Sequence, residues 1–383
     1  MDRATLEVAL KQQVHHLAAR VLEAKLNADH TDHRGATQPC PCGATARYVG
    51  RRAKGLTTVL GAITCERAYY HCAACGQGAA PRDAPCGLDA SGLSPGVQRL
   101  AAMVGAMSSF PEGAILLQEL AGIGVEAKAV ERTAQRLGHA VAQDEATHVT
   151  ATAPPSAVMY VGVDGTGIPM RPEVVAGRPG KPPDGSAHTR EVKECVVGTA
   201  DQRDAAGRPV RDDGSVSHSA AIENAAWAPG HPDRTPALAQ RGERELTRRG
   251  FFPARQQVLL GDGARWIWNL ASLIAPAALQ IVDGYHAKEH LSGLAATLFG
   301  PQTNAAHQWA TARHAERDAG ALDAVLAALR PFVTAPGDRG TRAATEYGYF
   351  HTNRDRMDYA RFRALGLSVG SGVLEAGCSS ANA

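Results

Sequence analysis

The sequence predicts a multidomain α/β protein, and three observations lead to this fold class. First, its 383 residues exceed the length of one typical domain of about 100–200 residues. Second, six of the eight cysteines lie between positions 40 and 86. Third, beyond position 156 short apolar runs alternate with helical patterns, as in a sheet covered by helices. We therefore predict four segments in chain order: residues 1–30, 31–90, 91–150 and 156–383.

Residues 1–30 are predicted to form an N-terminal helix. Apolar side chains recur there every three or four residues, which is the period of one helical face, and the opposite face is largely polar. Such a stripe is typical of a coiled-coil-like dimer seam, and equally of a helix that packs on its own domain. The stripe consists of Leu6, Leu10, Val14, Leu17 and Val21.

Residues 31–90 are predicted to form a zinc-ribbon-like module of short strands. Cys40 and Cys42 are separated by one residue, and Cys72 and Cys75 by the usual two, followed by a glycine. Clustered cysteines in a cytosolic chain indicate metal ligands more readily than disulfides. Four thiolates predict one closed, structural Zn²⁺ site. Two further cysteines are either substitute ligands or small buried apolar residues: Cys65 and Cys86.

Residues 91–150 are predicted to be helical. The stretch 113–132 has the sequence of a helix, a glycine-containing turn and a second helix, which is the shape of a helix-turn-helix. Two packed helices joined by such a turn are common, so this segment either contacts DNA or serves as a helical packing unit or dimer contact.

The charge pattern indicates a partner only locally. The net charge of +2 favours no particular partner. Between positions 40 and 82, however, six charged side chains are basic and one, Glu66, is acidic, which indicates either a nucleic-acid footprint or an ordinary solvated surface. The chain has no signal-peptide pattern and no run of about 18 apolar residues, so we expect a cytoplasmic protein without a membrane span.

The fourth segment follows a linker of small residues and two prolines at 151–156. Asp164 follows a strand predicted over 158–163, and Asp262 follows one predicted over 257–261. Each aspartate precedes a glycine and alone marks a tight turn. As a pair at the carboxyl ends of neighbouring strands, they predict a site for Mg²⁺ or Mn²⁺, which prefer carboxylate oxygens.

Three more residues are candidates for the same site. Asp283 and His286 follow a strand predicted over 279–282 and either orient substrate near the metal or support the fold, the aspartate capping a helix. Glu375 follows a Gly-Ser-Gly turn and is expected to open a helix. It either supplies a third carboxylate to the metal or merely suits the helix dipole.

Taken together, these residues resemble those of bacterial insertion-sequence transposases of the ISKra type, which are related to the Mutator-like group. The resemblance covers nearly the whole chain. Each motif is short, but their joint order is specific. The motifs are the two cysteine pairs with Arg67–His71 between them, Val163–Gly167, Thr189–Lys193, Gly261–Ala264, Asp283–His286 and Gly370–Glu375.

The resemblance implies an RNase H-like catalytic core with an Asp-Asp-Glu triad. By motif match, Asp164 and Asp262 are the first two acids and Glu375 is the third. A helical stretch from about 291 to 345 then becomes an insertion between the second aspartate and the glutamate. The Asp-x-x-His element that these transposases carry between the last two acids is matched by Asp283 and His286.

The implied activity is DNA transposition. The enzyme would bind the terminal inverted repeats of its element in double-stranded DNA, cut phosphodiester bonds at the element ends and join the 3′-hydroxyl to target DNA. The triad would hold two Mg²⁺ or Mn²⁺ ions, and the cysteines a structural Zn²⁺. The resemblance also implies a homodimer or higher oligomer on DNA, in the nucleoid of a bacterial cytoplasm.

One departure from the family leaves an alternative open. Similar proteins continue well past the glutamate through a basic helical stretch, whereas this chain stops eight residues after Glu375. A helix needs more length than this to pack firmly. The alternative is therefore a truncated, catalytically inactive DNA-binding product of a mobile element. A metal-dependent nuclease unrelated to mobile elements is a third hypothesis, but it leaves the cysteine module unexplained.

Overall fold

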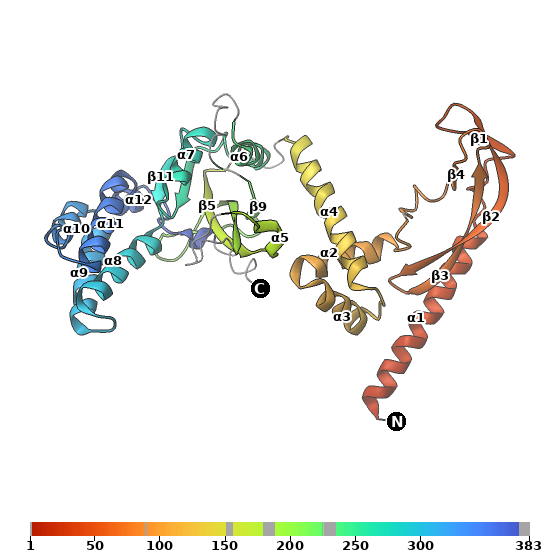
Figure 1. Ribbon diagram of the computed structural model, residues 1–383, viewed down its shortest axis with the longest axis horizontal. Coiled ribbons are helices and arrows are strands. Elements are labelled where there is room, and N and C mark those ends of the chain that lie inside the picture. Colours follow the sequence, from red (N-terminus) through yellow and green to blue (C-terminus); the bar gives the residue numbers. More distant parts are fainter. Residues whose placement is uncertain are drawn as a thin grey trace. The chain divides into compact units, whose positions relative to one another are not determined.

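Figure 1 shows a computed structural model of the protein, which describes residues 2–88, 90–150, 156–178, 188–223, 225 and 235–374. The chain divides into two compact units, one up to Gln143 and one from Asp144. Helices and sheets are mixed, so the predicted α/β class is confirmed at this level. No helix in the described part of the chain combines the length and the apolar character that a membrane span needs.

The first unit begins with the predicted N-terminal helix, α1 (Arg3–Ala28). Asp2 caps it by accepting a hydrogen bond from the Thr5 backbone N–H at 2.8 Å. Its second half packs through Ala19 on Leu56 and Ile63 of the following sheet. The predicted apolar stripe is exposed: its side chains Leu6, Leu10, Val14, Leu17 and Val21 are each about half exposed or more.

The cysteine segment forms an antiparallel sheet. Its strands are β1 (Thr37–Pro39), β2 (Thr45–Thr58), β3 (Gly61–His71) and β4 (Gly78–Ala79), paired in that order. The pairing of Arg47 with both Thr37 and His71 aligns the β1–β2 turn with the end of β3. The two turns that carry the cysteine pairs therefore lie at the same end of the sheet.

Three helices follow the sheet: α2 (Pro95–Met107), α3 (Phe110–Ala121) and α4 (Ala127–Thr147), of which α4 extends past the end of the first unit at Gln143. A capping box between Ser109 and Glu112 starts α3, and Gly122 ends it in the left-handed conformation with φ 68°. The helix, turn and helix predicted over 113–132 are therefore present. Val97, Leu117 and Val130 join the three helices in one apolar cluster.

The second unit is built on a five-stranded mixed sheet. Its strands are β5 (Val158–Pro169), β6 (Thr189–Thr199), β9 (Ser217–Ala221), β10 (Gln256–Gly261) and β11 (Leu279–Val282), in the spatial order β11-β10-β5-β6-β9. β10 runs parallel to β5 and β11, and β6 runs antiparallel to β5 and β9. A separate short pair is formed by β7 (Gln202–Arg203) and β8 (Pro209–Val210), and a short helix α5 spans Pro172–Val175.

The predicted end of the first strand is wrong. β5 does not stop at Val163 but continues to Pro169, so Asp164 lies within the strand. The reason is the antiparallel partner: β6 pairs with β5 as far as Thr189 opposite Pro169 and supplies the hydrogen bonds there. The parallel pairing with β10 does end at Val163, so Asp164 still follows the last residue of that pairing.

One face of the sheet is covered by α6 (Ala237–Arg248) and α7 (Arg265–Ile274) (Figure 1). α6 comes so close at Gly242 that an added Cβ would lie 3.1 Å from Ile274 Cδ1 and 3.8 Å from Cys195 Sγ. Cys195 is buried among apolar side chains. It pairs with Val163 of β5, so the two side chains lie on the same face of the sheet. Since side chains alternate along a strand, Asp164 points to the opposite face.

A helical segment follows β11 directly, as predicted, and ends in a short 3₁₀ turn. The core of the sheet continues into it through Leu291, Val325 and Phe350. The helices are α8 (Gly284–Phe299), α9 (Asn304–Asp318), α10 (Leu322–Leu329), α11 (Asp338–Thr352) and α12 (Tyr359–Ala364), before the turn η3 (Ser371–Val373).

Candidate functional site

Three aspartates lie side by side at one end of the second unit's sheet. The pairing of β10 ends with Gly261 opposite Val163 of β5 and opposite Val282 of β11. Because these strands are parallel and about 4.8 Å apart, the next residues occupy neighbouring positions. Those residues are Asp164, Asp262 and Asp283, which line a pocket of about 500 Å³ together with His286.

Asp164 and Asp262 are the two acids with the chemistry of a cation site. The pocket walls partly desolvate the Asp164 carboxyl and the negative charge of Asp262 lies nearby, so the pKa of Asp164 is raised above its usual value. Each side chain also accepts a local backbone hydrogen bond through Oδ1: Asp164 from Gly165 at 2.6 Å, and Asp262 from Ala264 at 2.7 Å. Two like charges held in one pocket favour a cation between them.

Asp283 also lines this pocket, but both of its carboxylate oxygens are bonded to backbone N–H groups. Its side chain is buried, and Oδ1 accepts hydrogen bonds from the backbone N–H groups of Tyr285 at 2.6 Å and His286 at 3.3 Å, which caps α8. Its Oδ2 accepts from the backbone N–H of Ser371 at 2.7 Å. Of the two roles considered for Asp283, helix capping is therefore observed. His286 is exposed at the pocket.

Replacing Asp283 with alanine is expected to lower the free energy of unfolding of the second unit by about 2–3 kcal/mol. The change leaves three backbone N–H groups without their acceptor, in a buried position. Urea unfolding of the full chain measures the effect. Asp358, which caps α12 through Arg361 alone at 3.2 Å, is the matched control. Its alanine variant should lose about 1 kcal/mol; an equal loss in both variants would contradict the tie to Ser371.

The end of the described chain is anchored over the same face of the sheet. Leu374 is 3 % exposed and lies on two glycines of neighbouring strands. A Cβ added at Gly162 would lie 2.8 Å from Leu374 Cδ1, and one at Gly198 would lie 3.1 Å from its Cδ2, so larger residues there would displace this side chain. Leu374 lines the pocket of Asp164 and Asp262. The next residue, the predicted third acid Glu375, lies outside the described residues.

Tyr349 of α11 and Asn353, which follows the helix directly, hold the turn after β10. The Tyr349 hydroxyl donates to the backbone oxygen of Asp262 at 2.7 Å, and Asn353 Nδ2 donates to that of Gly263 at 3.3 Å. Gly263 has φ 101°, and a Cβ there would lie 2.5 Å from Tyr349 Cε2. The His290 ring stacks on Tyr349 with centroids 3.9 Å apart. These supporting residues were not predicted, since nothing in their local sequence ties them to a turn almost 90 positions earlier.

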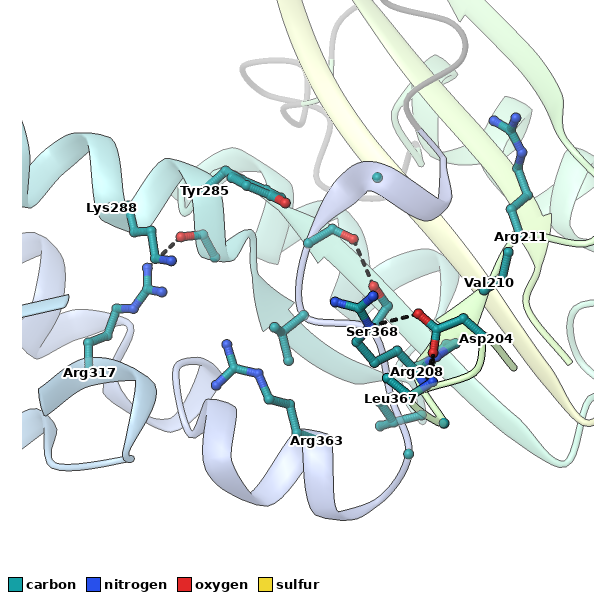
Figure 2. Close-up of a pocket in the computed structure, with 18 of the residues that line it drawn as sticks. Asp204, Arg208, Val210, Arg211, Tyr285, Lys288, Arg317, Arg363, Leu367 and Ser368 are labelled. Atoms are coloured by element: carbon teal, nitrogen blue, oxygen red, sulfur yellow. Dashed lines mark hydrogen bonds and ion pairs between the residues drawn. The ribbon is translucent and has the colours of Figure 1, made fainter. Parts of the chain in front are cut away.

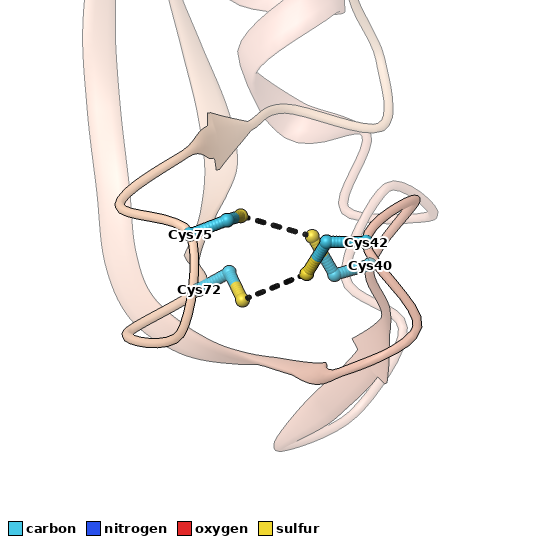
Figure 3. Close-up of side chains that lie close together, drawn as sticks. All are labelled: Cys40, Cys42, Cys72 and Cys75. Atoms are coloured by element: carbon cyan, nitrogen blue, oxygen red, sulfur yellow. Dashed lines mark hydrogen bonds between the residues drawn. The ribbon is translucent and has the colours of Figure 1, made fainter.

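The four predicted cysteine ligands meet in the first unit (Figure 3). Cys40 Sγ lies 3.6 Å from Cys75 Sγ, and Cys42 Sγ lies 3.7 Å from Cys72 Sγ. All four sulfur atoms lie within 4.8 Å of one another. With Zn–S bonds of about 2.3 Å, the edge of a tetrahedral site is about 3.8 Å. The spacing therefore fits one zinc ion.

Each cysteine pair lies in a tight backbone turn. Gly43 and Gly76 have φ values of 86° and 70°, and their N–H groups donate to the backbone oxygens of Cys40 and Cys72, each at 2.9 Å. These tight turns need the left-handed conformation that glycine adopts freely. The backbone N–H of Cys75 lowers the pKa of Cys72 to about 7, which favours the thiolate of Cys72, whereas contacts among the four thiols raise the pKa of Cys40 and of Cys75 above the usual value.

Among the residues that the structure describes, only these four cysteines bring three or more metal-ligating side chains close enough for a single ion. The acidic pocket contributes the pair Asp164 and Asp262. Neither the protein-family models nor the curated proteins give a match to this chain.

Proposed function

We propose that the protein is a metal-dependent DNA transposase of an insertion sequence, of the ISKra type, with an RNase H-like catalytic core. The observation that carries the proposal is the strand register: it brings Asp164 and Asp262 to adjacent positions on two parallel strands, at the edge of one pocket. A mixed sheet with its acids on central strands is consistent with such a core, as is the helical segment between Asp262 and the end of the chain.

The donor set fits Mg²⁺ or Mn²⁺. Proteins commonly hold Mg²⁺ through one or two carboxylates, while water and substrate phosphate occupy the other positions. Asp164 and Asp262 would supply the carboxylates, and by the resemblance Glu375 would be the third. When bound, such ions activate the attacking water or 3′-hydroxyl and stabilise the leaving oxygen of a phosphodiester.

The protein's own residues would keep the acids in place for this chemistry. Tyr349 and Asn353 fix the turn that carries Asp262. Asp283 and Leu374 fix the segment that leads to the third acid. A site held in this way needs little rearrangement when substrate arrives.

The first unit would recognise double-stranded DNA at the element ends. Its zinc module has the composition of a small basic domain, and α3 and α4 have the shape of a helix-turn-helix. The exposed apolar stripe of α1 favours association of the chain with a second copy, as a homodimer or higher oligomer on DNA. We place this activity in the bacterial nucleoid.

Incubation of the full chain with plasmid DNA carrying the element ends, in the presence of Mn²⁺, tests the proposal. Nicks at the ends, followed by joining of 3′-hydroxyls to other DNA, are expected. Binding to the ends without cleavage would replace the proposal by the inactive DNA-binding product. Cleavage without preference for the ends would replace it by a nuclease unrelated to mobile elements.

Millimolar Mn²⁺ is expected to raise the melting temperature of the second unit. At a hundredfold excess over its dissociation constant, a bound ion adds about 2.7 kcal/mol, or about 5–10 °C for a unit of this size. Differential scanning calorimetry of the full chain, with and without Mn²⁺, measures this shift. A wild-type transition that does not respond to Mn²⁺ would contradict the metal site.

The Asp164→Asn variant provides the control, because the pKa of Asp164 is raised in the folded state. The folded protein then holds this proton more tightly than the unfolded chain, so stability falls as the pH rises through the two pKa values. Above the folded pKa the ionised carboxylate destabilises the fold. At neutral pH and without metal, Asp164→Asn should therefore melt above the wild type, and its response to Mn²⁺ should disappear.

A further inference from the structure

Figure 2 shows a second pocket in the second unit, with a volume of about 750 Å³. Its walls are the β7–β8 hairpin, the first turns of α8 and the segment 366–372. Within that segment, Ser371 lines the acidic pocket instead, and its backbone N–H donates to Asp283. Gly284, which follows Asp283 in the chain, lines the second pocket. Its backbone N–H donates to the backbone oxygen of Val369 at 2.7 Å. One short segment therefore separates the two pockets.

The second pocket is basic. Asp318 lies behind its wall and pairs with Arg317, with Lys288 at 3.5 Å and with Arg363 at 3.4 Å, so three cations share one carboxylate. Burial opposes the charge of Asp318, but the Arg317 hydrogen bond and these cations hold its pKa below the usual value. Two further arginines line the hairpin side, where Arg208 pairs with Asp204. Arg211 and Asp213 line the pocket as well. The pocket and its wall therefore hold five cations but only three carboxylates, those of Asp204, Asp213 and Asp318.

Arg317 is built into the pocket wall. The residue is 1 % exposed, its guanidinium donates to the backbone oxygen of Gly284, and its Cζ lies 4.7 Å from the centre of the Tyr359 ring. Its Nε is buried and has no hydrogen-bond partner among the described residues. Asp318 offsets the charge of Arg317, but Lys288 and Arg363 have only a share of the same carboxylate, so positive charge is in excess at this wall. The pocket therefore favours an anionic ligand.

An aromatic side chain stands at the same pocket. Tyr285 is 65 % exposed and lies against Gly370, where an added Cβ would come within 3.0 Å of its ring. An exposed aromatic ring next to several cations is the combination that binds single-stranded nucleic acid, the ring stacking on a base and the cations contacting phosphates. Bases stacked inside a duplex offer no free face to such a ring, so the ligand must have an unstacked base.

We propose that this second pocket binds a single-stranded stretch of DNA next to the strand that is cut, with Tyr285 stacking on one base, Lys288 and Arg363 contacting its phosphates, and the buried Arg317 adding positive charge to the wall. The inference rests on the proposed function, because the acidic pocket across the 366–372 segment is then the cleavage site. A strand held here would present its neighbouring phosphodiester to Asp164 and Asp262.

Fluorescence anisotropy tests this with a DNA duplex that ends in a single-stranded overhang, compared with the same duplex made blunt. No Mg²⁺ or Mn²⁺ is added, so the measurement does not depend on cleavage. The wild-type full chain should bind the overhang more tightly than the blunt duplex. Tyr285→Ala should weaken overhang binding by about 5- to 150-fold, while Tyr285→Trp should retain it.

The cations are tested by the salt dependence of the same binding. Lys288→Ala combined with Arg363→Ala should lower the slope of log affinity against log salt by about 1.4, or about 0.7 for each lost contact with a single strand. The matched control is Arg354→Ala, which removes a cation of the same helical segment that pairs with Asp323 away from the pocket. It should leave both slope and affinity unchanged.

A photocrosslink locates the contact. An overhang with 5-iodouracil should crosslink to the peptide that contains Tyr285. The proposal is overturned if the wild type binds overhang and blunt duplex equally, if the variants weaken both to the same extent, or if crosslinks form only elsewhere. Displacement of the overhang by an equal concentration of a free deoxynucleotide would overturn it in favour of a nucleotide site. If the overhang binds at this pocket but the element ends are not cleaved, the pocket proposal is supported and the proposed transposase activity is refuted.

Discussion

Replacement of Cys72 by serine is expected to remove the zinc from the protein and to unfold the cysteine module. The wild-type full chain should contain about one zinc per chain, since four sulfur atoms surround one tetrahedral position. Structural zinc contributes about 10–16 kcal/mol of apparent binding free energy at neutral pH, far more than the small apolar cluster of Ala46, Ala68 and Tyr70 supplies around it. Elemental analysis by mass spectrometry gives the zinc content, and limited proteolysis of residues 31–90 gives the folding state.

Cys86→Ser is the matched control for this variant. Cys86 lies in the same module but outside the four-sulfur cluster, so its loss should leave the zinc content at about one per chain. Cys65→Ser should also retain zinc, because Cys65 is buried among Ala19, Leu56 and Ile63 rather than near the cluster. Equal zinc content in the wild type and in Cys72→Ser would refute the site.

The local sequence pattern predicts many of the elements, because a short apolar run marks a buried strand and because the hydrogen bonds and caps of a helix are local. The strand expected over 279–282 is β11 itself, and the helix, glycine turn and helix over 113–132 are present. The end of β5 was predicted wrongly because it depends on a distant partner. The residues after Asp164 are held in the strand by β6, and nothing near them in the sequence reveals that pairing.

In the candidate site, too, the residues marked by a local pattern could be predicted, and the contacts between distant residues could not. Aspartates at the ends of parallel pairing can be found from sequence, since the apolar run and the following Asp-Gly are adjacent. The tie from Asp283 to Ser371 and the hydrogen bond from Tyr349 to Asp262 join positions almost 90 residues apart. Such contacts follow from tertiary packing, and the presence of a tyrosine or a serine in the sequence does not predict which distant residue it will contact. The second pocket was missed for the same reason, because its cations come from the β7–β8 hairpin, α8, α9 and α12.

Asp262→Asn is expected to reduce DNA cleavage at the element ends by more than about 100-fold. Removal of a group that only orients a metal ligand costs about 10- to 100-fold, and Asp262 is proposed as a ligand itself. The asparagine keeps an oxygen that can accept the 2.7 Å hydrogen bond from the Ala264 backbone N–H, and Tyr349 still holds the Asp262 backbone. The turn should therefore survive while the charge is lost. Cleavage is measured on plasmid DNA with Mn²⁺, over a range of metal concentrations.

Asp323→Asn is the charge-matched control, because Asp323 is 80 % exposed in its side chain and pairs only with Arg354 among the described residues. It should cleave as the wild type does. End binding by Asp262→Asn should also match the wild type, since that step belongs to the first unit in the proposal. If Asp262→Asn keeps its cleavage at saturating Mn²⁺, the pair of acids does not hold the catalytic metal. If it loses end binding and cleavage together, Asp262 acts on folding or DNA binding instead, and the register of β5 and β10 carries no catalytic meaning.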